Sequence, residues 1–146
     1  MADINIETGN KVLVLITPQF NAHRLIDEGK KISNEIDGSL HILYIKKGGN
    51  IFSEGKTAEI LQDIFMYASK KGGIVHARCS ENIKEEMIDF IINENVTKVI
   101  FGQSPITKRL TKKDIASEIK HQLDIKSCNA EVVVVEKEEM DIYKAI

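Results

Sequence analysis

The residues best suited to chemistry in this chain of 146 residues lie in the stretch VIFGQSPITKRLTKK (99–113). Glycine lets a backbone approach a ligand closely, hydroxyl groups donate hydrogen bonds, and Lys and Arg carry charge that suits a phosphate. The stretch holds all three kinds of group, at Gly102, Ser104, Thr107, Lys108, Arg109 and Thr111. Taken alone, these residues fit an exposed connection with solvated basic side chains better than a phosphate site, and both interpretations stay open.

A second polar stretch, TPQFNAHR (17–24), follows the first apolar run of the chain. Thr17, Gln19 and Asn21 can each donate and accept hydrogen bonds, and the Gln19 amide suits the edge of a planar base. Asn21 alone is better explained as the N-cap of the helix that follows it.

The chain lacks the sequence patterns of common catalytic and metal sites. It contains no Walker A motif, no G-x-G-x-x-G and no G-x-S-x-G nucleophile elbow. Its four histidines fall on different predicted elements without metal-ligand spacing, and neither of its two cysteines lies in an activating motif. We therefore expect no catalytic activity and no metal site.

Composition bounds the class of protein. Apolar residues make up 42% of the chain, charged residues 29%, and the formal net charge is −2, which is ordinary for one soluble globular domain. This balance gives no general attraction to nucleic acid or to an anionic membrane, so an anion site must be local. The basic run KRLTKK (108–113) lacks interleaved aromatic residues, which disfavours nucleic-acid binding.

Features of the termini and cysteines predict the compartment. The N-terminal segment MADINIETGN carries two acidic residues and no apolar run, so we expect no secretory signal. Apolar runs such as Val132 to Val135 are too short to span a bilayer. Cys79 and Cys128 lie far apart in the chain and are expected to be free thiols in a reducing compartment. We expect a cytoplasmic protein that binds no membrane.

Strand-like and helix-like patterns alternate along the chain. Short apolar runs predict strands at 11–17, 39–45, 74–80, 98–102 and 130–136. Apolar spacings of three and four predict helices at 22–36, 56–71, 81–92 and 111–124, the third with Ser80 as its N-cap. The domain is expected to span 10–137, followed by a tail at 138–146.

This alternation predicts an α/β fold with three layers, in which a doubly wound, five-stranded parallel sheet carries helices on both faces. Such sheets bind ligands at the carboxyl ends of their strands, where the strand order reverses. In a five-stranded sheet of this kind, the loops after the first and fourth strands flank that crevice. These loops are the two polar stretches described above, so the sequence predicts that they meet.

The chain from about residue 10 to residue 137 resembles a universal stress protein domain, and most of all the divergent version within the sensor histidine kinase KdpD. Three stretches carry this resemblance: RLIDEGKKISNEIDGSLHILYI, FIINENVTKVIFGQS and KRLTKKDIASEIKHQLDIKSCNAEVVVVE. The resemblance implies the Rossmann-like fold of the adenine nucleotide alpha hydrolase-like proteins. It also implies an adenine nucleotide in the crevice after the first and fourth strands.

The resemblance also shows where this chain departs from the ATP-binding members of the family, which carry G-x2-G-x9-G-[ST] after the fourth strand. The first glycine matches Gly102, Pro105 replaces the second, and Lys113-Asp114 stand where Gly-Ser would be. Because an aspartate repels phosphate, the resemblance argues against ordinary ATP binding. The KdpD-like version also lacks the glycine motif, and some of its members bind cyclic di-AMP in the same crevice.

The resulting expectation is a non-catalytic regulatory domain that senses a small adenine nucleotide, either cyclic di-AMP or weakly bound ATP or AMP. The resemblance places the adenine-side group at Gln19 and a backbone contact near Ile45. The full set of expected nucleotide-binding residues is Thr17, Pro18, Gln19, Asn21, Ile45, Gly102, Ser104, Lys108 and Arg109. The alternatives are a protein-interaction module with a vestigial nucleotide site, acting on a KdpD-like signalling or potassium transport system, and a weak ATPase.

The last predicted strand is an apolar edge. Family members often dimerise through this strand, and an exposed edge invites pairing, so we expect a homodimer formed by Val132, Val133, Val134 and Val135. The alternative is that the tail after Lys137 covers the edge within one chain.

Overall fold

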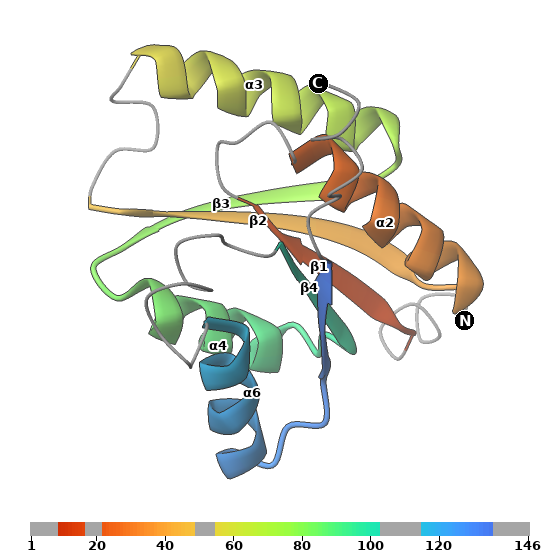
Figure 1. Ribbon diagram of the computed structural model, residues 1–146, viewed down its shortest axis with the longest axis vertical. Helices are drawn as coiled ribbons and strands as arrows, with labels where there is room; N and C mark the ends of the chain where they lie inside the picture. The colour runs from red at the N-terminus through yellow and green to blue at the C-terminus, as the bar shows by residue number, and fades with distance from the viewer. Residues whose placement is uncertain (1–8, 17–21, 49–54, 103–114, 136–146) are drawn as a thin grey trace, which may run out of the picture.

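The computed structural model of the chain describes residues 9–16, 22–48, 55–102 and 115–135 (Figure 1). Along the chain, its elements are β1 (Lys11–Leu15), α2 (Ala22–Glu35), β2 (Ser39–Lys47), α3 (Gly55–Lys70), β3 (Ile74–Ser80), α4 (Ile83–Asn93), β4 (Lys98–Gly102), α6 (Ile115–Ile125) and β5 (Glu131–Val135). None of the helices in these ranges is long and apolar enough to cross a membrane.

The five strands form one parallel sheet in the order β3-β2-β1-β4-β5. β1 lies at the centre, where Val12 pairs with Leu40 of β2 on one side and with Lys98 of β4 on the other. Helices α2 and α3 cover one face of the sheet, and α4 and α6 cover the other (Figure 1). The predicted three-layer, doubly wound fold is therefore confirmed.

The core consists of two clusters, one on each face of the sheet. Successive residues of a strand point to opposite faces, so Leu13 packs with α4 and α6 while Val12 and Val14 pack with α2 and α3. Burial on both faces explains why the strand sequences are continuous apolar runs rather than alternating ones.

Helix α2 lies unusually close to the sheet at Gly29. A Cβ atom added to this glycine would lie 2.4 Å from Cγ2 of Val14 and 3.0 Å from Cδ1 of Leu40. Both of those side chains are buried. Glycine is therefore required here for close packing of the helix on β1 and β2.

One predicted helix start is wrong. The N-cap of α4 is Asn82, whose side-chain oxygen accepts a hydrogen bond from the Glu85 N–H at 3.0 Å. Ser80 is instead the last residue of β3, because strand pairing continues as far as Lys47 and Ser80. The Ser80 hydroxyl oxygen accepts a hydrogen bond from the Asn82 N–H at 3.1 Å and so shapes the turn between strand and helix.

Other boundaries shift by one or two residues. β1 ends at Leu15 rather than at residue 17, and β2 extends to Lys47 rather than stopping at Ile45. Residues 111–114 of the fourth predicted helix and the tail at 138–146 lie outside the described ranges.

Candidate functional site

The topology creates a switch point between β1 and β4. These strands are neighbours at the centre of the sheet, and β2 continues the strand order on one side of them while β5 does so on the other. The helix that follows β1 packs on one face and the helix that follows β4 packs on the other. Adjacent strands whose following helices pack on opposite faces are the arrangement at which open α/β sheets bind ligands.

Gly102 is the one expected site residue that the structure places at the end of β4. It is partly buried and pairs with Val135 of β5. Its position as the last residue of the strand puts its backbone at the carboxyl edge, directly before the basic loop.

Ile45 is the other expected site residue within the described ranges. Its side chain is only 8% exposed and packs in the core with α4 and α6, so it cannot face a ligand. Ile45 nevertheless lies two residues beyond Leu43, the partner of the last residue of β1. Its backbone therefore lies just beyond the point where the pairing of β2 with β1 ends, and the backbone contact expected from the resemblance stays a prediction.

The remaining expected site residues lie outside the described residues. These are Thr17, Pro18, Gln19 and Asn21 after β1, and Ser104, Lys108 and Arg109 after β4. The structure thus describes the strand ends at which the crevice is predicted, and Gly102 lies at one of them.

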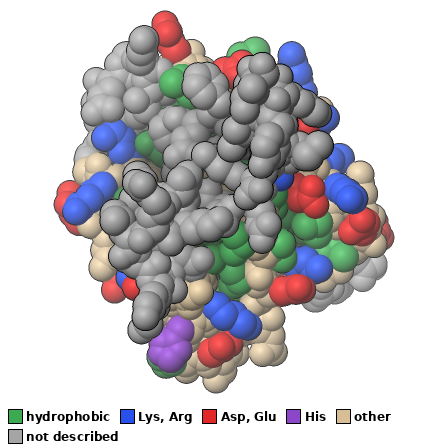
Figure 2. Space-filling view, viewed as in Figure 1, with side chains coloured by type: hydrophobic (Ala, Val, Ile, Leu, Met, Phe, Trp, Pro, Cys, Tyr) green, Lys and Arg blue, Asp and Glu red, His purple; other side chains and the backbone are tan. Residues whose placement is uncertain are grey.

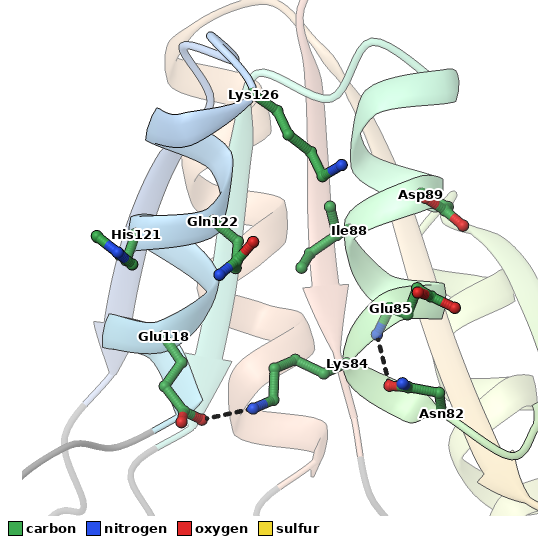
Figure 3. A pocket seen from close by; sticks show the side chains of 9 residues that line it. All are labelled: Asn82, Lys84, Glu85, Ile88, Asp89, Glu118, His121, Gln122 and Lys126. Atoms are coloured by element: carbon green, nitrogen blue, oxygen red, sulfur yellow. Dashed lines mark hydrogen bonds and ion pairs between the residues drawn. The ribbon is translucent and has the colours of Figure 1, made fainter.

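A polar cavity of about 500 Å³ lies between α4 and α6 (Figure 3). An ion pair between Lys84 and Glu118 at 3.1 Å bridges the two helices at one end, and Lys126, the residue after α6, lies at the other. The buried side chain of Ile88 lies between them. The sequence did not reveal this cavity, because its walls come from two helices that are far apart in the chain.

The described residues offer no constellation for metal chemistry. In ranges 9–16, 22–48, 55–102 and 115–135, no three His, Cys, Asp or Glu side chains come together in a way that could hold an ion. Cys79 is exposed and Cys128 is partly buried, and both are free thiols. On the face drawn in Figure 2, acidic and basic side chains of the described residues are interspersed.

The structure shows contacts between histidines and other side chains that the sequence did not predict. His41 and His76, which lie 35 positions apart, are in contact across β2 and β3, with ring nitrogens 3.1 Å apart. His23 of α2 stacks on Tyr67 of α3 with ring centroids 4.1 Å apart, and its Nε2 lies 3.0 Å from an oxygen of Asp63. The ring stacking places the first turn of α2 against α3.

Comparison with known proteins supports the fold. No family model and no curated protein sequence matches the chain. A solved universal stress protein from Archaeoglobus fulgidus superposes with a TM-score of 0.62, at 14% identity over 86% of this chain and 92% of that one.

Two further structures contain nucleotides. A universal stress protein in complex with cAMP has a TM-score of 0.61, at 12% identity over 89% of this chain and 98% of that one. The universal stress protein from Archaeoglobus fulgidus in complex with dAMP has a TM-score of 0.57, at 14% identity over 86% and 96%. The chain therefore has the α/β fold of the universal stress proteins.

Proposed function

We propose that this chain is a non-catalytic, cytoplasmic regulatory domain of the universal stress type that binds a small adenine nucleotide between the loops after β1 and β4. The observation that carries the proposal is the switch point in the sheet. There β1 and β4 are adjacent, the helices that follow them in the chain pack on opposite faces, and Gly102 ends β4. Two proteins of the same fold are in complex with cAMP and dAMP, and both ligands are adenine nucleotides.

The loop chemistry favours a ligand with few phosphates. Backbone amides of a glycine-rich loop would be needed to cradle a triphosphate, yet Pro105 and Asp114 occupy two positions of the family motif. Lys108 and Arg109 instead offer two charged side chains that suit a phosphodiester or a monophosphate. Cyclic di-AMP and AMP therefore fit better than ATP.

Removal of the two basic side chains tests this proposal. We expect Lys108→Ala with Arg109→Ala to lower affinity for the bound adenine nucleotide by roughly 1.5–3 kcal/mol for each charge-assisted bond lost. Isothermal titration calorimetry measures this change. The control is Lys31→Ala with Lys70→Ala, which removes the same charge at exposed sites on α2 and α3. Equal affinities for the two double variants would remove the basic loop from the site.

A second candidate function, protein interaction, follows from the edge of the sheet. Among the described strands, β5 pairs only with β4, and Val134 is 40% exposed. This edge supports a homodimer through Val132 to Val135, or docking on a partner such as a KdpD-like signalling protein, with the nucleotide crevice vestigial.

The dimer is tested by sedimentation equilibrium. Val134→Lys should shift the wild-type dimer to a monomer, because a charge on the pairing strand opposes edge-to-edge contact. Ile125→Lys, at a residue that is 61% exposed on α6, is the matched control. A monomeric wild-type protein, or a Val134→Lys variant that dimerises as well as the control, would contradict this assembly.

A further inference from the structure

The two histidines on β2 and β3 form a continuous polar chain with Ser39. Nδ1 of His41 lies 3.1 Å from Nε2 of His76, and Nε2 of His41 lies 3.0 Å from the Ser39 hydroxyl oxygen. The two rings are stacked with centroids 5.3 Å apart and planes 19° apart. Both ring nitrogens of His41 therefore have partners within the protein, and the residue is only 8% exposed.

Proton counting shows that this contact depends on pH. A hydrogen bond between two ring nitrogens needs one N–H group and one lone pair, so at least one imidazole must be neutral. If both rings were protonated, two N–H groups would face each other across the 3.1 Å between the nitrogens, and two cationic rings would be in contact. Burial makes even a single positive charge costly here.

The charged groups around the pair add to this cost. The charged groups that act on the pair are Lys11 of β1, Arg78 of β3, and Glu94, which is the residue after α4. Burial, followed by His76 and then Lys11, lowers the pKa of His41 to about 4, and only Glu94 opposes this. Burial and then Arg78 lower the pKa of His76 as well. Two cations against one carboxylate therefore favour the neutral pair.

The pair joins an edge strand to the rest of the molecule. Among the described strands, β3 pairs only with β2, and none of its residues is fully buried. Its His76 ring also packs edge-on against Phe90 of α4, with centroids 4.8 Å apart. An edge strand with little buried surface belongs to the least stable part of a fold, so the histidine contact adds to the backbone pairing with β2 in holding β3 in place.

We propose that the His41–His76 contact is an acid-sensitive latch that holds β3 on the sheet and against α4, and that acidification releases β3 before the central strands. This inference is independent of the proposed nucleotide site. It predicts a local opening rather than global unfolding, because β1 and β4 are buried at the centre of the sheet.

Hydrogen exchange of the full-length protein, followed by mass spectrometry, tests the latch. With the His41 pKa near 4 in the closed state and near its ordinary value of 6.5 in the open state, opening of β3 should increase about 20-fold between pH 7 and pH 5. Rates are corrected for intrinsic exchange. Peptides from β4 should change by much less. Unchanged protection of β3, or equal loss in β3 and β4, would overturn the proposal.

Variants separate the latch from general acid effects. His41→Gln keeps a polar side chain that does not titrate, so the pH dependence of β3 should largely disappear. His121→Gln, at an exposed position of α6, should keep it. The same pH dependence in His41→Gln as in the wild type would refute the latch. If His41→Gln fails to fold, the ring signals of wild-type His41 and His76 should titrate in the pH range where β3 opens, and titration without opening would refute the latch.

Discussion

Gly29 offers a sharp test of how α2 sits on the sheet. In an ordinary helix, replacing glycine by alanine stabilises the protein by about 0.5–1 kcal/mol, because alanine has less backbone freedom to lose. Here the added methyl group would lie 2.4 Å from Cγ2 of Val14, a side chain with no exposed surface. Val14 is β-branched and has few rotamers to choose from, so the backbone of α2 must move.

Overpacking of a core usually costs about 1–3 kcal/mol, which exceeds the gain in helix propensity. We therefore expect Gly29→Ala to lower the free energy of unfolding by about 1–2 kcal/mol, or about 3–6 °C in Tm. The Leu40 methyl group at 3.0 Å adds to the conflict. Chemical denaturation measures the loss, with Lys31→Ala at an exposed position of the same helix as the control.

A double variant identifies the clash as the cause. Val14→Ala alone should destabilise the protein because it leaves a cavity. Combined with Gly29→Ala, the new methyl group occupies part of that cavity, so the two losses should not add, and the coupling should be about 1 kcal/mol. A Gly29→Ala variant as stable as the wild type, or strictly additive losses, would refute the close packing of α2 on β1.

Three further predictions concern stability. Asn82→Ala should cost about 1 kcal/mol in urea denaturation by removing the N-cap of α4, and Asn82→Ser should restore most of it; equal stability of the two variants would rule out a capping role. Leu123→Ala should cost about 2–5 kcal/mol because this side chain has no exposed surface. Ile125→Ala on the same helix, at a residue that is 61% exposed, should change stability little, and similar losses would be inconsistent with the packing of α6. Because the pKa of His41 is lowered to about 4, its contribution to stability is fully present above its ordinary pKa of about 6.5 and is lost as the pH falls through about 4. Denaturation midpoints from pH 7 to pH 4 measure this, and in His41→Gln the acid loss should shrink.

The layer architecture was predictable because the sequence carries two strong and consistent signals. Continuous apolar runs such as KVLVLI (11–16) belong to strands buried on both faces, and these alternate with segments of helical periodicity. Right-handed crossovers then leave few strand orders, and the observed order β3-β2-β1-β4-β5 makes β1 and β4 neighbours, as the predicted meeting of the loops after them requires. The position of the crevice follows from that order alone.

The start of α4 could not be located from sequence. Ser80 and Asn82 are both good N-cap residues, and they lie two positions apart. The choice depends on how far β3 pairs with β2, and that pairing ends at Lys47 and Ser80. Such register is a property of the assembled sheet, so local patterns do not reveal it.

The histidine pair was missed for a similar reason. Nothing in the sequence spacing links His41 with His76. They meet because parallel pairing sets His76 opposite Leu43, two residues along β2 from His41 on the same face of the sheet. Gly102 was identifiable beforehand as a lone glycine that ends an apolar run. Side chains of a strand alternate between the two faces of the sheet, so Ile45 points to the same face as Leu43, where α4 and α6 cover it.

The most direct test of the nucleotide proposal is a thermal melt of the pure protein with AMP, cyclic di-AMP or ATP, with the matching guanine nucleotides as controls. A ligand at 100 times its Kd stabilises the folded state by about 2.7 kcal/mol, which is about 5–10 °C for a domain of this size. We expect such a shift with cyclic di-AMP or AMP and little or none with the guanine nucleotides. An unchanged Tm with every adenine nucleotide would contradict the proposed site and leave protein interaction as the function to pursue.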